Sequence, residues 1–138
     1  MKSNLTYGKV ADLFPRTGTI LIADRWFQGR SILEEWGCPV LWIEASEQEK
    51  TFATVERLFS QLLDLQADRD TLLVGVGGGI TTDMVGFAAS IYKRGIDYAN
   101  IPTTLLAQVD ASIGGKTGVN LDAYKNILGS FRQPRMFL

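Results

Sequence analysis

Residues 74–87 read VGVGGGITTDMVGF, and this stretch decides the fold class of the chain. It overlaps the run TLLVGV (71–76), which is uncharged and largely apolar, as a strand buried on both faces tends to be. After the glycines at 77–79, apolar side chains return at helical spacing. A strand that turns through glycine into a helix brings unpaired N–H groups and the helix dipole to one point, which suits a pyrophosphate. We predict that Gly78 and Gly79 bind phosphate there; a tight turn without a ligand is the structural alternative.

Short apolar runs alternate with helical patterns along the chain. Strands are predicted at 19–23, 40–44, 71–76 and 98–101. Helices are predicted at 27–35, at 47–66, and from Gly79 to a stop at Gly95. Such alternation is typical of an α/β protein with a Rossmann-like parallel sheet and helices on both faces. Ligands of these sheets bind at the carboxyl ends of the strands, which is where the glycines fall here.

The pattern weakens after Pro102. We expect a helix at 103–113, a strand or hairpin arm at 116–121, and a helix at 125–131 that stops at Pro134. The last residues, RMFL, offer no obvious closing element. We therefore expect this chain to be the first part of a longer protein.

The composition excludes several classes of function. With 138 residues and a net charge of −1, the chain can form one folded domain and has no global basic field for nucleic acid or an anionic membrane. Its apolar runs are too short to span a bilayer, and its start lacks the apolar core of a signal peptide. The absence of histidine excludes Ser–His–Asp and Cys–His catalysis by this chain alone and disfavours a zinc site. The single cysteine, Cys38, fits a reducing compartment, and we expect a cytoplasmic protein.

A second glycine stretch, DASIGGKTG (110–118), ends like a P-loop. The P-loop motif needs glycine at its first position, where this chain has Asp110, and a carboxylate would repel a triphosphate. Lys116 stands between a glycine and a threonine, where little side-chain packing can support it. The stretch is therefore interpreted as something other than a P-loop, with a functional role for Lys116.

Three segments carry a resemblance to a known family: GGGITTDMVGFAASIYKRGI (77–96), IPTTLLAQVDASIGGKTGVN (101–120) and KNILGSFRQP (125–134). Together they resemble 3-dehydroquinate synthase, a member of the sugar-phosphate cyclase superfamily. The resemblance implies that residues 1–138 form the NAD-binding N-terminal domain of a two-domain enzyme. It places the zinc ligands, a glutamate and two histidines, in a helical second domain that this chain lacks. The resemblance thus implies that this domain alone is inactive.

The resemblance also implies roles for individual residues. It assigns Asp24 to the adenosine ribose, Glu47 and Lys50 to the adenine and ribose end, Gly78 and Gly79 to the pyrophosphate, and Asp83 to the nicotinamide half. It assigns Thr103, Thr104, Asp110 and Lys125 to further contacts with the cofactor. It assigns Arg94, Lys116 and Asn126 to the substrate.

Structural alternatives to these roles stay open. Glu47 and Lys50, three residues apart, could form a surface pair, and a carboxylate at Asp83 could simply favour the helix N-terminus. Arg94 follows a predicted helix and could answer its C-terminal dipole, and the threonines could cap a helix. Thr82 stands where the family often has glycine, so the helix start could differ. The tryptophans at 26, 36 and 42 are interpreted as packing residues.

The activity implied by the resemblance is the cyclisation of DAHP, a seven-carbon sugar acid phosphate, to 3-dehydroquinate with loss of phosphate. This is a step of the shikimate pathway, in which NAD is a recycled catalyst and zinc acts as a Lewis acid. The family is commonly dimeric. Another sugar-phosphate cyclase and a polyol dehydrogenase of the same superfamily are the enzymatic alternatives. A nucleotide-binding module without activity is the alternative from a different class.

Overall fold

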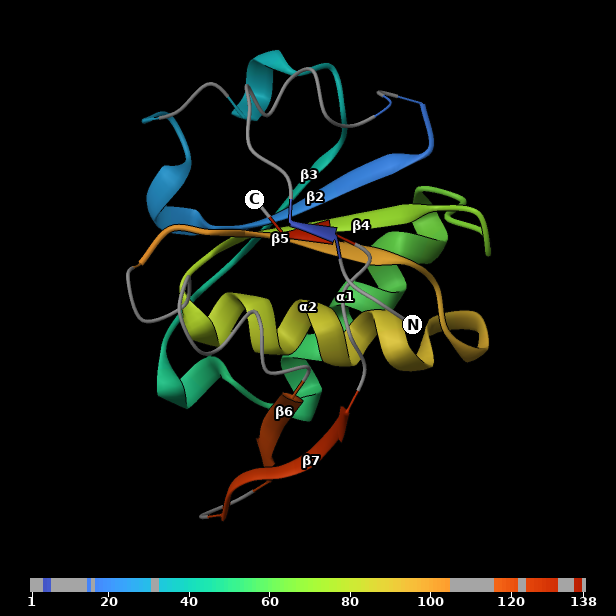
Figure 1. The fold of residues 1–138 in the computed structure, drawn as a ribbon. Coiled ribbons are helices and arrows are strands. Elements are labelled where there is room, and N and C mark those ends of the chain that lie inside the picture. The colour runs from blue at the N-terminus through green and yellow to red at the C-terminus, as the bar shows by residue number, and fades with distance from the viewer. Residues whose placement is uncertain are drawn as a thin grey trace.

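The computed structural model describes residues 4–5, 15, 17–30, 33–104, 116–121, 124–131 and 136–137. Its centre is a parallel sheet with the strand order β1-β8-β5-β4-β2-β3 (Figure 1). The strands are β1 (Asn4–Leu5), β2 (Thr19–Asp24), β3 (Val40–Ile43), β4 (Leu72–Gly77), β5 (Tyr98–Pro102) and β8 (Met136–Phe137). The parallel α/β sheet and its four predicted strands are thereby confirmed.

The two α-helices of the described residues pack on one face of this sheet, below it in Figure 1, so the expectation of α-helices on both faces is not met in this part of the chain. They are α1 (Phe52–Asp64) and α2 (Gly79–Ile91). The predicted periodicity of α1 is confirmed, because its buried apolar residues Val55, Leu58 and Leu62 form one stripe. The Thr51 side chain caps this helix by accepting from the Thr54 N–H at 3.3 Å. The helix α2 is buried over most of its length, since it lies between the sheet and other elements.

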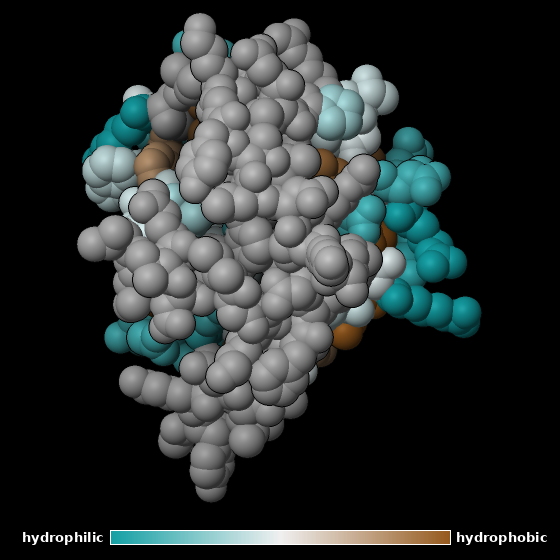
Figure 2. All heavy atoms as spheres, in the orientation of Figure 1, coloured by the Kyte–Doolittle hydropathy of each residue, from teal (hydrophilic) through white to brown (hydrophobic). Residues whose placement is uncertain are grey.

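The opposite face of the sheet is covered by the segment between β2 and β3. Its residue Leu33 packs against Leu21, Ala23 and Val74, with Phe27 and Trp36 partly buried beside them. The strands β2 and β4 are therefore enclosed on both faces, which explains their continuous apolar sequence. On the face drawn in Figure 2, the hydrophobic surface of the described residues is confined to small, separate areas.

The predicted helix at 27–35 is wrong. The structure has two 3-10 helices instead, Arg25–Phe27 and Leu33–Glu35. Between them Gly29 has a φ of +73°, which a right-handed helix cannot use, and its N–H donates to the Glu34 carboxylate at 2.9 Å. A helical pattern of apolar residues was present, but the glycine inside it decides the local conformation.

The predicted helix at 125–131 is also wrong. Residues Tyr124–Phe131 form the strand β7, which pairs antiparallel with β6 (Lys116–Leu121) in a separate hairpin. The expected hairpin arm at 116–121 is confirmed. Because β6 supplies the backbone partners of β7, the pairing overrides the weak helical pattern.

Two further outcomes concern the ends of predicted elements. Residues 136–137, which were expected to close nothing, form β8 between β1 and β5. The helix α2 ends at Ile91, before the predicted stop, and a 3-10 helix (Tyr92–Arg94) leads to Gly95 at φ +110°. Most of the predicted helix at 103–113 lies outside the described residues, which include only its first two. Pro134, where the predicted helix at 125–131 was expected to stop, also lies outside them. Within the described part of the chain, no helix is both long and apolar enough to cross a bilayer.

Candidate nucleotide-binding site

A cavity of about 530 Å³ opens at the carboxyl ends of β2, β4 and β5. Its walls are formed by Asp24, Trp26, Phe27, Ala45, Gly78, Gly79, Ile80, Thr81, Thr103 and Thr104. Parallel strands bring their carboxyl ends to one edge, so residues far apart in sequence meet there. The structure thus brings together five of the predicted cofactor residues: Asp24, Gly78, Gly79, Thr103 and Thr104.

The glycine turn allows a close approach of three elements. A Cβ atom on Gly77 would lie 2.6 Å from the Thr81 hydroxyl oxygen, so this glycine lets α2 start directly against β4. A Cβ atom on Gly78 would lie 3.1 Å from the Thr104 methyl carbon, so this glycine lets the end of β5 approach the turn. None of the glycines at 77–79 has a positive φ. Close packing, rather than backbone conformation, requires the glycines at 77 and 78.

The first turn of α2 is available for an anion. Gly78 is the N-cap of this helix, and no described side chain caps it. Gly79, Ile80 and Thr81 of the first turn line the cavity. The Thr81 hydroxyl oxygen is fully buried and has no hydrogen-bond partner among the described residues. Uncapped N–H groups and the positive end of the helix dipole fit the pyrophosphate of a dinucleotide.

Thr82 does not alter this helix start. It lies within α2, where its N–H donates to the Gly78 carbonyl at 3.0 Å and its hydroxyl to the Gly79 carbonyl at 3.2 Å. Its φ is not positive. The β-branched residue is therefore accommodated as an ordinary helical residue.

Asp24 and Thr103 are fixed by the ends of their strands. The Asp24 carboxylate caps the following 3-10 helix by accepting from the Trp26 N–H at 3.1 Å through one oxygen. No described residue bonds to its second oxygen, which leaves an acceptor for a ribose hydroxyl. The Thr103 N–H donates to the Gly77 carbonyl at 2.9 Å, and its side chain is exposed at the cavity.

Lys50 and Asp83 form a buried ion pair beside the glycine turn. The Lys50 ammonium donates to the Asp83 carboxylate across 2.8 Å, and the two side chains are only 5% and 22% exposed. The alternative of a surface Glu47–Lys50 pair is therefore wrong. The contact joins Nζ to Oδ2 directly. The implied roles of Lys50 at the adenine and ribose end and of Asp83 at the nicotinamide half stay predictions.

The surroundings of Asp83 raise its pKa. Burial is the largest cause, and the negative charge of Glu47 adds to it, while the hydrogen bond and charge of Lys50 act in the opposite direction. The cation beside Asp83 also offsets a carboxylate that would otherwise repel a phosphate at the start of α2.

Asn120 is a site residue that sequence reasoning missed. Its side-chain amide donates to the backbone carbonyl of Glu47 at 3.3 Å and to the Glu47 carboxylate at 3.1 Å. Its backbone N–H donates to the Lys50 carbonyl at 2.8 Å. The strand β6 thus holds the segment that carries both Glu47 and Lys50. The sequence signal was present, since Asn120 ends the motif that carries the resemblance, but its burial was not visible.

The remaining predicted residues lie elsewhere or outside the description. Arg94 is exposed and follows the C-terminal end of α2, a helix roughly 20 Å long at 1.5 Å per residue that begins at the glycine turn. Lys116 begins β6, and Lys125 and Asn126 belong to β7, while Asp110 lies outside the described residues. The side-chain positions of Lys116, Lys125 and Asn126 are also outside the description. The roles of all five residues stay predictions.

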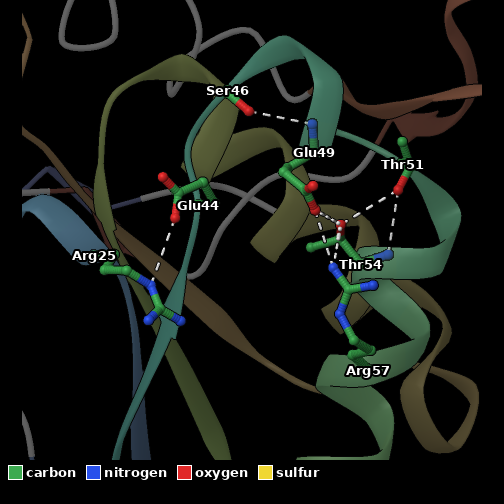
Figure 3. A network of polar contacts seen from close by, with 7 residues as sticks. All are labelled: Arg25, Glu44, Ser46, Glu49, Thr51, Thr54 and Arg57. Carbon is green, nitrogen blue, oxygen red and sulfur yellow. Dashed lines mark hydrogen bonds and ion pairs between the residues drawn. The ribbon is translucent and has the colours of Figure 1, made fainter.

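A larger cavity of about 700 Å³ lies between β3 and α1, beside the end of β3 at Ile43 and Glu44. Its charged groups already pair with each other: Arg25 with Glu44 at 3.6 Å, and Arg57 with Glu49 at 3.0 Å (Figure 3). Thr54 joins the second pair through hydrogen bonds to both partners. These exposed groups satisfy one another, so the smaller cavity is the better candidate for a ligand.

The fold and the smaller cavity define an α/β protein of the kind that binds nucleotides at the carboxyl ends of a parallel sheet. Residues 40–138 match the family described as 3-dehydroquinate synthase N-terminal, and the chain belongs to this family. The 3-dehydroquinate synthase of Helicobacter pylori (strain G27) is 56% identical over 93 residues, which are 67% of this chain and 27% of that protein. The chain therefore spans about a quarter of the length of this relative.

Two solved structures of related cyclases superpose on the chain. 2-Deoxy-scyllo-inosose synthase, complexed with carbaglucose-6-phosphate, NAD+ and Co2+, is 32% identical with a TM-score of 0.83, covering 98% of this chain and 42% of its own. The 2-epi-5-epi-valiolone synthase of Streptomyces hygroscopicus subsp. jinggangensis 5008, with NAD+ and Zn2+ bound, is 26% identical with a TM-score of 0.86, covering 100% and 42%. Both likenesses support the cyclase superfamily.

Proposed function

We propose that the whole protein is a 3-dehydroquinate synthase, which cyclises DAHP to 3-dehydroquinate with elimination of phosphate. The observation that carries this proposal is the 56% identity to a named 3-dehydroquinate synthase, against 32% to the cyclase of a different sugar phosphate. We further propose that residues 1–138 are its NAD-binding N-terminal domain. We also propose that the whole protein is a cytoplasmic homodimer and that it acts in the shikimate pathway.

NAD fits the residues around the smaller cavity. The uncapped first turn of α2 suits the pyrophosphate, and the second oxygen of Asp24 suits a ribose hydroxyl. When bound, NAD supplies a reversible hydride acceptor. The chain's own residues bind it and orient it, with Glu47 and Lys50 proposed at its adenine and ribose end and Asp83, the ion-pair partner of Lys50, at its nicotinamide half.

Binding of the anionic substrate is assigned to Lys116, Arg94 and Asn126. A lysine ammonium and an arginine guanidinium would neutralise phosphate or carboxylate oxygens, and an amide would hydrogen-bond to them. Asp110 and Lys125 are proposed to lie on the cofactor side. The isolated chain is expected to be inactive, because it spans 27% of a full-length relative.

A divalent metal is proposed for the whole enzyme, because related cyclases were solved with Co2+ or Zn2+. Among the described residues, no group of three or more His, Cys, Asp and Glu side chains could hold a metal ion. The residues present do not fit a metal, so its ligands are proposed to belong to the rest of the protein.

Phosphate release from DAHP by the full-length protein tests the proposal. We expect release that depends on added NAD once the bound cofactor is removed. The neighbouring cyclases make another sugar phosphate the second candidate substrate. Turnover of glucose 6-phosphate or a non-acidic heptulose phosphate, without release from DAHP, would replace 3-dehydroquinate synthase by that second cyclase activity.

A further inference from the structure

Trp26 is a large apolar side chain exposed beside the candidate cofactor cavity. Its surface is 60% exposed, whereas Trp36 and Trp42 pack against the core on the same face of the sheet. The interpretation of Trp26 as a packing residue is therefore wrong. A single exposed apolar side chain is ordinary on a protein surface, but this one lines the cavity that is proposed to hold the dinucleotide.

Neighbouring residues hold this indole in one orientation. The Arg30 guanidinium carbon lies 5.1 Å from the centroid of the ring, and the same guanidinium donates to the Trp26 carbonyl at 3.0 Å. Phe27 meets the ring edge-on, with centroids 5.1 Å apart and planes at 88°. The backbone N–H of Trp26 donates to the Asp24 carboxylate at 3.1 Å, which fixes the main chain from which the indole projects. An exposed side chain that is held from several sides loses little entropy when a ligand binds.

The position of Trp26 relates it to one end of the cavity. It follows Asp24, the proposed ribose acceptor, by two residues and lines the same cavity as the glycine turn. Trp26 therefore lies next to the residue that is proposed to hold the adenosine ribose.

We propose that the Trp26 indole stacks on the adenine ring of the dinucleotide and is a specificity-determining residue for the adenosine half. This inference rests on the proposed use of NAD. Purine bases and indoles stack favourably through their π-faces, and Arg30 on the ring polarises and steadies the platform. The glycine turn then receives the pyrophosphate that follows the adenosine.

Equilibrium binding to the full-length protein tests the stacking. We expect Trp26→Ala to weaken binding of NAD and of ADP-ribose by about tenfold, the range for loss of one base–aromatic stack. The dissociation constant of nicotinamide mononucleotide, which has no adenine, should stay within about twofold of the wild-type value. Trp26→Phe keeps an aromatic face and should retain most of the affinity. Because Trp26 is exposed, both variants should fold, which a melting curve checks.

Tryptophan fluorescence gives a readout that a packing role would not change. ADP-ribose should quench part of the emission of wild type and of Trp42→Phe, the matched control at a half-buried tryptophan outside the cavity. The same ligand should not quench Trp26→Phe. Unchanged NAD affinity in Trp26→Ala, or persistent quenching in Trp26→Phe, would overturn the stacking while leaving NAD binding intact. Failure of wild type to bind NAD would instead overturn the proposed function, and the inference with it.

Discussion

Lys50 donates a hydrogen bond to Asp83 across 2.8 Å and joins the segment before α1 to the second turn of α2. The two residues are 33 positions apart in sequence, and Lys50 is only 4% exposed. This contact fixes the start of α2 relative to the rest of the site, and it leads to the first two predictions.

Lys50→Met should destabilise the protein by about 3 kcal/mol, because it leaves the Asp83 carboxylate buried without its cation. Urea unfolding measures the loss. Arg57→Met is the matched control at an exposed ion pair and should cost less than about 1 kcal/mol. A double variant, Lys50→Met with Asp83→Leu, should recover part of the stability. Equal effects of the two single variants would contradict the importance of burial.

The raised pKa of Asp83 gives stability a pH dependence of a definite sign. In the folded state this group holds its proton to a higher pH than its ordinary value of 3.8, chiefly because of burial. The folded state therefore binds more protons, and the contribution of Asp83 to stability falls as pH rises from 3.8 through its raised pKa. Between pH 3.8 and the raised pKa, the free energy of unfolding of wild type should fall relative to that of Asp83→Asn. Above the raised pKa, the difference between the two proteins should stay constant. A difference that is constant with pH would contradict this assignment.

Gly77→Ala should destabilise the domain by about 1–3 kcal/mol, because the new Cβ atom would lie 2.6 Å from the Thr81 hydroxyl oxygen. The helix α2 would have to shift away from β4. Gly78→Ala should cost less, since its neighbour at 3.1 Å is the Thr104 methyl group, and Thr104→Ser removes that methyl. Thermal melting compares the variants. Recovery of stability in Gly78→Ala/Thr104→Ser, without recovery of NAD binding, would separate packing from phosphate binding.

Asn120→Ala should weaken NAD binding and cost roughly 0.5–1.5 kcal/mol of stability, because it removes the side-chain donor to the carbonyl and carboxylate of Glu47, an exposed residue that water can still solvate. Calorimetric titration of NAD and urea unfolding measure the two effects. Asn120→Asp has nearly the same shape but places a carboxylate against that of Glu47, so its defect should ease as pH falls. Equal affinity for NAD in wild type and Asn120→Ala would show that the Asn120–Glu47 hydrogen bonds have no influence on cofactor binding.

Much of the fold could be predicted because its strands are short, continuous apolar runs bounded by polar segments. The strand β2 and the helix α1 carry strong local patterns, and β2 was predicted near its true bounds. The helix α1 begins at Phe52, five residues after the predicted start, because residues 47–49 form a 3-10 helix. The strand β7 was not predicted, because its extended conformation is set by pairing with β6 rather than by its own local sequence. In the segment after β2, the left-handed Gly29 interrupts a pattern that otherwise resembles a helix.

The candidate site could be predicted only where residues stand at strand ends or in the glycine turn. Asp24, Gly78 and Thr103 meet because parallel strands end at one edge, which sequence order already indicates. The Lys50–Asp83 ion pair and the Asn120–Glu47 hydrogen bond depend on contacts between segments that are distant in the sequence. The exposure of Trp26 depends on how the 3-10 helix after β2 lies on the sheet, and no periodicity reports that.

The place of β8 in the sheet has a consequence for the order of assembly during synthesis. The strands β2 to β5 can pair as they leave the ribosome, but β1 must wait, because Asn4 pairs with Met136 of β8 and β8 in turn pairs with β5. Until residues 136–137 emerge, one edge of β5 is open and β1 has no strand to join. A nascent chain that stalls before Met136 would therefore expose a sheet edge able to recruit another chain.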